Sequence, residues 1–99
     1  MTPSIRRKLE ELKDRHQEVG VMLSDPDVIS DNTRYRALSR EYAGLEPASS
    51  ALSAYESTEI ALKEMQLMAS GGDAEMAELA REELPELRAK LQDLDGSVS

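Results

Sequence analysis

The beginning of the chain carries apolar side chains at alternating spacings of four and three residues, which places them on one face of a helix. This seam consists of Ile5, Leu9, Leu12, His16, Val19 and Leu23. The alternation of apolar and polar residues that is typical of a half-buried strand occurs nowhere in the sequence. Because a narrow apolar seam is buried most readily against another helix, the chain is predicted to be all-α.

The first of three long helices is predicted to begin at Thr2-Pro3, since threonine caps helices well and proline is tolerated in the first turn. It is expected to run to about Leu23. The polar stretch 24–27 contains Pro26 and stops it, because the residue before a proline is biased away from helical geometry. Val28 and Ile29 follow in this link, and we expect both to attach the loop to the core.

The second helix is predicted over residues 32–69, with Asp31 as its N-cap and with Pro47 interrupting its apolar stripe. Proline lacks the N–H that would bond to the preceding turn, so we interpret the element as one helix kinked near Pro47, with two abutting helices as the alternative. Its apolar positions are Tyr35, Leu38, Tyr42, Leu45, Ala48, Leu52, Tyr55, Leu62, Met65 and Met68.

The pair Gly71-Gly72, followed by Asp73 as a cap, separates the second helix from the last. The last helix contains Pro85, where we expect either a bend or a new segment, and it is predicted to end near Gly96. The tail 96–99 is predicted to be disordered. The apolar positions of this helix are Met76, Leu79, Ala80, Leu84, Leu87, Leu91 and Leu94.

The composition favours a thin aliphatic core, because apolar residues make up 39% of the chain and Phe, Trp and Cys are absent. A single domain over residues 1–99 is predicted, built as an antiparallel helical bundle or as helical hairpins. Without cysteine there are no disulfides and no thiolate sites. No apolar run approaches the roughly 18 residues of a membrane span, so no membrane is expected among the partners and a cytoplasmic location is predicted.

No set of residues suited to catalysis or to binding a metal or a cofactor is found, and the chain is not expected to be an enzyme. His16 is the only histidine, and one histidine cannot supply a zinc site. We interpret it as a partly buried residue that forms a hydrogen bond at a helix interface. The glutamates of the last helix are expected to be solvated, since no histidine or apolar cleft accompanies them.

The net charge of −8 is distributed unevenly along the chain. Residues 46–99 hold four bases and twelve acids, which gives −8, whereas residues 32–45 hold three arginines against one glutamate, which gives +2. A phosphate backbone would be repelled by the acidic half. The candidate contacts with a polyanion or with an acidic partner are therefore Arg34, Arg36 and Arg40, with an ordinary solvated face as the alternative.

Residue order in three stretches is more informative than their chemistry. These are the opening around Pro3–Val19, the run RYRALSREYA at residues 34–43, and the acidic segment at residues 73–84. Together they resemble the N-terminal domain of bacterial peptide chain release factors of the type-1 class. The resemblance covers essentially the whole chain, and RYRALSREYA is its most specific part.

This resemblance implies translation termination, in which the whole protein recognises UAA or UAG and triggers hydrolysis of peptidyl-tRNA on the ribosome. The family depends on a Gly-Gly-Gln tripeptide for hydrolysis and on a Pro-x-Thr-type tripeptide for codon choice. Neither occurs here, since Gly71-Gly72 precedes Asp73 and no proline has threonine two places on.

We therefore expect a truncated N-terminal docking domain whose partners are the ribosome, at the stalk base of the large subunit, and the class II release-factor GTPase. The stop codon of the mRNA would be contacted only through domains outside these residues. The alternative interpretation, supported by the seam of the first helix, is a self-associating coiled-coil adaptor or chaperone subunit.

Overall fold

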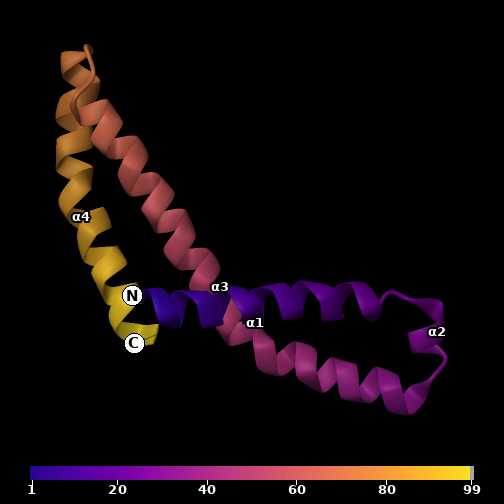
Figure 1. Ribbon diagram of the computed structural model, residues 1–99. Helices are drawn as coiled ribbons and strands as arrows, with labels where there is room; N and C mark the ends of the chain where they lie inside the picture. Colours follow the sequence, from indigo (N-terminus) through magenta and orange to yellow (C-terminus); the bar gives the residue numbers. More distant parts are fainter. Residues whose placement is uncertain (99) are drawn as a thin grey trace. The chain divides into compact units, whose positions relative to one another are not determined.

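The computed structural model describes residues 1–98, which form helices and short connections without any strand. The helices are α1 (Pro3–Met22), α2 (Pro26–Ile29), α3 (Asn32–Ala69) and α4 (Ala74–Val98), as Figure 1 shows. The predicted all-α class with three long helices is confirmed. The chain divides into two compact units, Thr2–Leu52 and the part from Ser53 onward together with Met1. The prediction of one domain over residues 1–99 stays a prediction.

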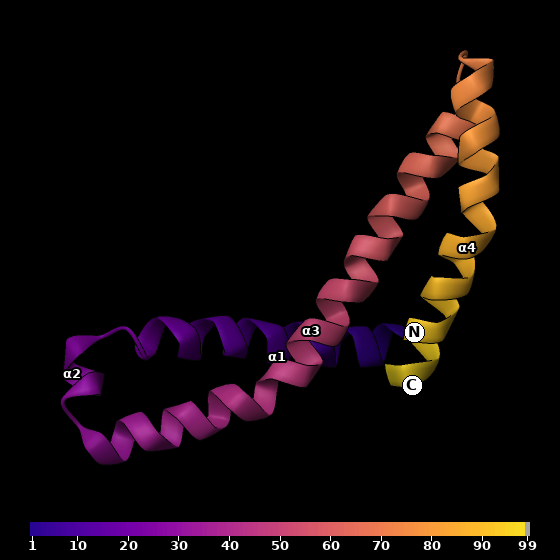
Figure 2. The ribbon, with the colours of Figure 1, turned by 180° about the vertical axis from the view of Figure 1, so that it is seen from behind.

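The first unit, which we call the first hairpin, consists of α1, α2 and the first part of α3. The two long segments run antiparallel and are joined through α2, which is visible from both sides in Figures 1 and 2. A cluster of Val19, Val28 and Leu38, which are at most 8% exposed, forms its core. Every residue of the predicted α1 seam is buried or half-buried, so this stripe is confirmed as the packing face of α1.

Helix α2 was not expected from the sequence, which indicated a polar link at this place. Its N-cap is Asp25, whose Oδ1 accepts a hydrogen bond of 2.9 Å from the N–H of Asp27, and Pro26 occupies the first turn. Val28 is buried, as predicted. Ile29 is 55% exposed, so the expectation that it also attaches the link to the core is wrong. A one-turn helix directs consecutive side chains about 100° apart, and only Val28 faces the core.

The predicted caps of the three long helices are confirmed. The hydroxyl of Thr2 accepts from the N–H of Ile5 at 3.3 Å. The Asp31 carboxylate accepts from the N–H of Arg34 at 3.2 Å. Asp73 caps α4 with two bonds of 3.1 Å from backbone N–H groups of its first turn. These side chains satisfy donors that a helix start otherwise leaves unpaired.

Helix α3 is continuous through Pro47, so the alternative of two abutting helices is wrong, and the bend expected near Pro47 stays a prediction. Helix α4 likewise continues through Pro85. It extends to Val98, past the end expected near Gly96. Part of the tail predicted to be disordered, namely Ser99 and the side chains of residues 97 and 98, lies outside the described residues.

The second unit, the second hairpin, pairs the remainder of α3 with α4 across Gly71-Gly72 (Figure 1). At the end of α3, Nη2 of Arg81 donates a hydrogen bond of 3.3 Å to the carbonyl of Ala69, which links the two helices next to the turn. Thr58 is buried and satisfies its hydroxyl internally by donating to the carbonyl of Ala54 at 2.8 Å. The break predicted at Gly71-Gly72 is confirmed, and no glycine of the described residues has a positive φ, so the turn forms without a left-handed residue.

The packing face of α4 differs from the predicted stripe in its first turns. Ala77 and Ala80 are 2% and 1% exposed, whereas Met76 and Leu79 are 44% and 54% exposed. The predicted position Ala80 is confirmed as part of the packing face, whereas the placement of Met76 and Leu79 on it is wrong, because Ala77 is buried in these turns in their place. From Leu84 onward the seam follows the prediction, with spacings of three and four.

No helix in the described part of the chain combines the length and the apolar character needed to cross a membrane. The small apolar cluster of Val19, Val28 and Leu38 is expected to supply much of the stability of the first hairpin.

Replacing Leu38 by alanine tests this dependence. We expect Leu38→Ala to lower the free energy of unfolding by about 2–4 kcal/mol, because it removes buried methyl groups and leaves a cavity in a thin core. The matched change Val21→Ala, at a residue 74% exposed on α1, should cost less than about 0.5 kcal/mol. Urea denaturation followed by circular dichroism measures both, and equal losses would show that the cluster does not stabilise the hairpin.

Candidate partner-binding surface

The three arginines singled out in the sequence are all exposed on the first turns of α3, but they do not share one face. Arg36 and Arg40 are one turn apart and lie opposite the buried Leu38. Arg34 is two residues from Arg36, which turns its side chain by about 200°. The helix therefore brings Arg36 and Arg40 together and leaves Arg34 on another face.

The neighbours of this arginine pair along the helix are small or uncharged. Residues three or four positions from Arg36 or Arg40 are the ones that a helix brings next to them. Besides the pair itself these are Asn32, Thr33, Ala37, Ser39, Ala43 and Gly44. Arg6, by contrast, lies 3.4 Å from the carboxylate of Glu10, one turn away on α1. The pair thus presents two positive charges without a carboxylate one turn away.

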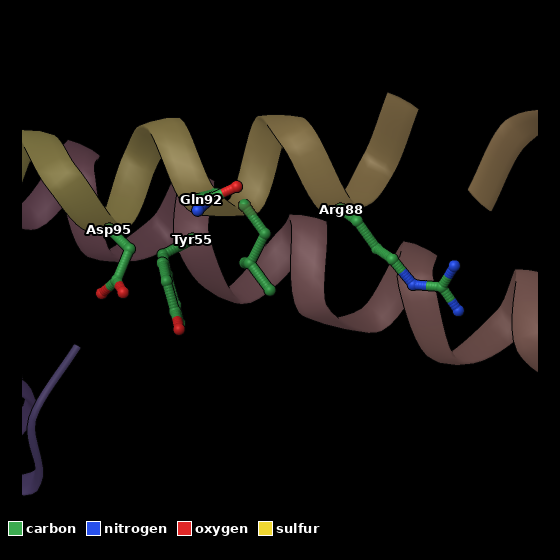
Figure 3. Close-up of a pocket in the computed structure, with 5 residues that line it drawn as sticks. Tyr55, Arg88, Gln92 and Asp95 are labelled. Atoms are coloured by element: carbon green, nitrogen blue, oxygen red, sulfur yellow. The ribbon is translucent and has the colours of Figure 1, made fainter. Parts of the chain in front are cut away.

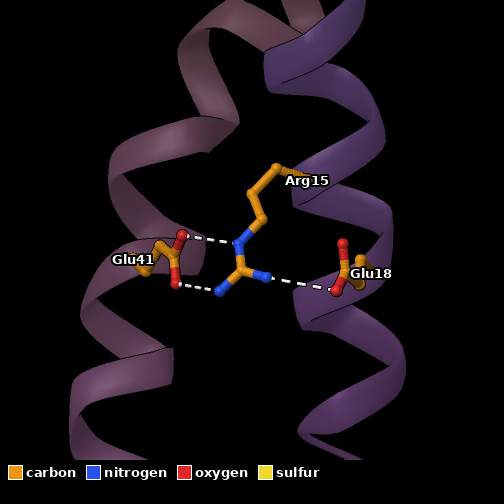
Figure 4. Close-up of polar contacts among 3 residues, drawn as sticks. All are labelled: Arg15, Glu18 and Glu41. Carbon is orange, nitrogen blue, oxygen red and sulfur yellow. Dashed lines mark hydrogen bonds and ion pairs between the residues drawn. The ribbon is translucent and has the colours of Figure 1, made fainter.

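An ion pair between α1 and α3 fixes which face of α3 points outward (Figure 4). Nε and Nη2 of Arg15 donate to the two carboxylate oxygens of Glu41 at 2.7 and 2.8 Å, and Nη1 donates to Glu18 at 3.2 Å. Such a two-bond arrangement matches the planar guanidinium to the planar carboxylate. Because of this contact the pKa of Glu41 is lowered and that of Arg15 is raised, in both cases chiefly through the side-chain hydrogen bonds between them.

The ring of Tyr42 packs between two residues of α1. It stacks on His16 with ring centroids 4.1 Å apart and an angle of 15° between the planes. On the same helix, a Cβ built on Gly20 would lie 3.2 Å from a ring carbon of Tyr42, so glycine is what admits the ring at this distance. Stacked rings of this kind add about 0.5–1.5 kcal/mol beyond burial.

His16 is a helix-interface residue, as predicted, with 12% of its side chain exposed. Its Nε2 lies 3.2 Å from a carboxylate oxygen of Glu46, but the geometry does not meet that of a hydrogen bond. The predicted position at a helix interface is therefore confirmed. The expected hydrogen bond of His16 is not formed by Nε2, which lies only within ion-pair distance of Glu46.

The Arg15–Glu41 contact was missed in the sequence, although a signal for it was present. Each residue directly precedes a seam residue, His16 and Tyr42 respectively. In two antiparallel helices, residues that flank the seam on the same side face each other across it, and opposite charges there form interhelical ion pairs. Pairing the flanks of the two predicted stripes would have found this contact.

A pocket of about 260 Å³ lies along the second hairpin, between α4 and Tyr55 of α3 (Figure 3). Its lining residues are Tyr55, Arg88, Leu91, Gln92 and Asp95. The volume is below the roughly 300–1,000 Å³ of typical small-molecule sites. Within the described part of the chain, no group of three or more His, Cys, Asp and Glu residues is arranged to hold a metal ion.

These features define a protein of helical hairpins that presents charged side chains, among them Arg36 and Arg40, on exposed helix faces. The family model of the PCRF domain, the domain of peptide chain release factors, matches residues 12–99, and the chain belongs to this family. The PCRF domain is a non-catalytic domain of proteins that act in translation termination on the ribosome. No solved structure matches the chain.

The Arg15–Glu41 pair makes the stability of the first hairpin depend on pH. A carboxyl group whose pKa is lowered by folding contributes stability above its ordinary pKa of about 4.3, and loses it as the pH falls through the lowered value. We therefore expect Glu41→Gln to lower the free energy of unfolding at pH 7 and to make little difference at pH 2. Urea denaturation at both values measures this. The same deficit at pH 2 would mean that the ion pair is not its cause.

Proposed function

We propose that the chain is the N-terminal docking domain of a release factor that directs termination at UAA and UAG. In this proposal it binds the stalk base of the large ribosomal subunit and the class II release-factor GTPase, in the cytoplasm. Codon reading and peptidyl-tRNA hydrolysis belong to other parts of such a factor, and the chain itself catalyses no reaction. The proposal is supported by the family match over residues 12–99 and by the resemblance of the RYRALSREYA run.

The observation that carries the docking role is the pair Arg36 and Arg40 on the outer face of α3. We assign to this pair the contact with ribosomal RNA. Two guanidinium groups one turn apart suit consecutive phosphates of an RNA backbone, because arginine binds phosphate with paired N–H donors. No residue of α3 one turn from either arginine is a carboxylate, so no ion pair of that kind competes with a phosphate.

The first hairpin presents this pair on a fixed scaffold. Leu38 and Tyr42 hold one face of α3 against α1, and the Arg15–Glu41 pair restricts rotation of α3 about its axis. A ligand then meets side chains on a helix that is already formed, which reduces the ordering cost of binding.

Neutralising the pair tests this function. We expect Arg36→Gln/Arg40→Gln to weaken binding of the labelled chain to purified ribosomes about tenfold or more. The slope of log affinity against log salt should become shallower by about 1.5, because two fewer counterions are displaced from RNA. Fluorescence anisotropy at several salt concentrations measures both quantities.

The matched control is Arg7→Gln/Lys8→Gln, which removes the same two charges from exposed positions of α1 in the same hairpin. Its affinity should stay close to that of the unchanged chain. If both double variants lose affinity and salt dependence equally, net charge alone explains binding and the assignment to α3 is wrong. If the unchanged chain does not bind ribosomes at all, the docking proposal fails.

The alternative of a self-associating coiled coil needs a free apolar seam on α1. In the first hairpin this seam is occupied by α2 and α3, through Val28 and Leu38 against Val19. We therefore expect a monomer in sedimentation velocity experiments over a hundredfold range of concentration. A stable oligomer throughout that range would favour the adaptor interpretation.

A further inference from the structure

The first turns of α4 expose an apolar pair that the second hairpin does not use. Met76 and Leu79 are 44% and 54% exposed, while Ala77 and Ala80 of the same turns are almost completely buried. Residues three apart on a helix are neighbours, so Met76 and Leu79 form one patch. A single exposed leucine is ordinary on a protein surface. This pair differs because acidic side chains lie next to it.

Carboxylates flank Leu79 along α4. The residues three or four positions from Leu79 are Glu75, Met76, Glu82 and Glu83. All three glutamates are exposed. Leu79 therefore has an acidic side chain at every neighbouring position along its helix face except the one that Met76 occupies.

The negative charge of this region is not balanced locally. Residues 73–86 contain six acids and one base, which gives a net charge of −5. That base, Arg81, is engaged within the hairpin, where it donates to the carbonyl of Ala69 at 3.3 Å and lies 3.4 Å from Glu78. The carboxylates around Met76 and Leu79 are thus left for a partner.

The charge decides which class of partner fits. Nucleic acid, anionic lipid and acidic proteins are repelled by this region. A second copy that paired through the same patch would place its own carboxylates against these. A segment that offers apolar side chains together with Lys or Arg complements both parts of the surface.

We propose that the Met76–Leu79 patch docks a basic amphipathic protein segment. This inference rests on the docking function proposed above and names the kind of partner that the acidic half of the chain binds. The apolar side chains of the partner cover Met76 and Leu79, and its cations pair with Glu75, Glu82 and Glu83. Asp73 caps the helix directly below the patch, through the N–H groups of Glu75 and Met76, so the surface is formed before binding.

The probe is a fluorescein-labelled 18-residue amphipathic peptide of leucine and lysine, titrated with the whole chain and followed by anisotropy. We expect saturable binding that Met76→Gln/Leu79→Gln weakens about tenfold or more, because the apolar contact is lost while the charge is unchanged. Glu75→Gln/Glu82→Gln/Glu83→Gln should also weaken binding and make it less sensitive to salt.

The matched control is Ile60→Gln/Leu67→Gln on α3. These residues are 58% and 74% exposed, lie in the same hairpin and undergo the same kind of change. Their substitution should leave the affinity unchanged. Circular dichroism of every variant verifies that its helical content is retained, and the Leu79→Gln single variant replaces the double variant if that one loses helix.

Two outcomes would overturn the proposal. One is an equal loss of affinity in the two double variants. The other is equally tight binding of a peptide in which every leucine is replaced by serine, since net charge would then suffice. The peptide assay contains no ribosomes and is independent of the ribosome-binding assay. If the unchanged chain binds ribosomes normally but binds the peptide weakly, the proposal for the Met76–Leu79 patch is wrong and the docking function is not affected. Peptide binding without ribosome binding refutes the docking function alone.

Discussion

The contact between α1 and α3 determines what the first hairpin presents to a partner. Leu38 is buried in the cluster with Val19, and the Tyr42 ring lies on His16 next to Gly20. Because Leu38 is buried, the helical repeat directs the side chains of Arg36 and Arg40 outward. The exposed cations are thus a consequence of the apolar packing, and a change in the register of this hairpin would rotate them away.

In the second hairpin, too, the residues that are buried determine which side chains are exposed, and here the buried side chains are smaller. Ala77 and Ala80 are almost completely buried at the start of α4. Small side chains at such positions allow packed helices to approach more closely. With the alanines inside, the larger Met76 and Leu79 are turned out of the interface. An apolar surface is exposed here because the interface selects small side chains, even though larger apolar ones are available in the same turns.

Much of the fold followed from sequence, and the failures have physical causes. The α1 seam and the caps Thr2, Asp31 and Asp73 were predicted, since spacing and capping are local properties. Helix α2 was missed although Asp25-Pro26 repeats the cap-plus-proline signal of Thr2-Pro3. At the start of α4 the predicted stripe was right for Ala80 and wrong for Met76 and Leu79, because hydrophobicity ranks methionine and leucine above alanine, whereas the buried positions here are Ala77 and Ala80. The arginine pair was identified from charge, but its separation from Arg34 required the helical geometry.

The two exposed surfaces carry opposite charge, and this separates their ligands. Residues 32–45 have a net charge of +2 and residues 46–99 a net charge of −8. A polyanion attracted to Arg36 and Arg40 is repelled by the carboxylates around Leu79, and a basic segment that suits Leu79 is repelled by the arginines. If both proposed surfaces bind as we infer, like-charge repulsion disfavours the wrong ligand at each one, in addition to the attraction of the right one.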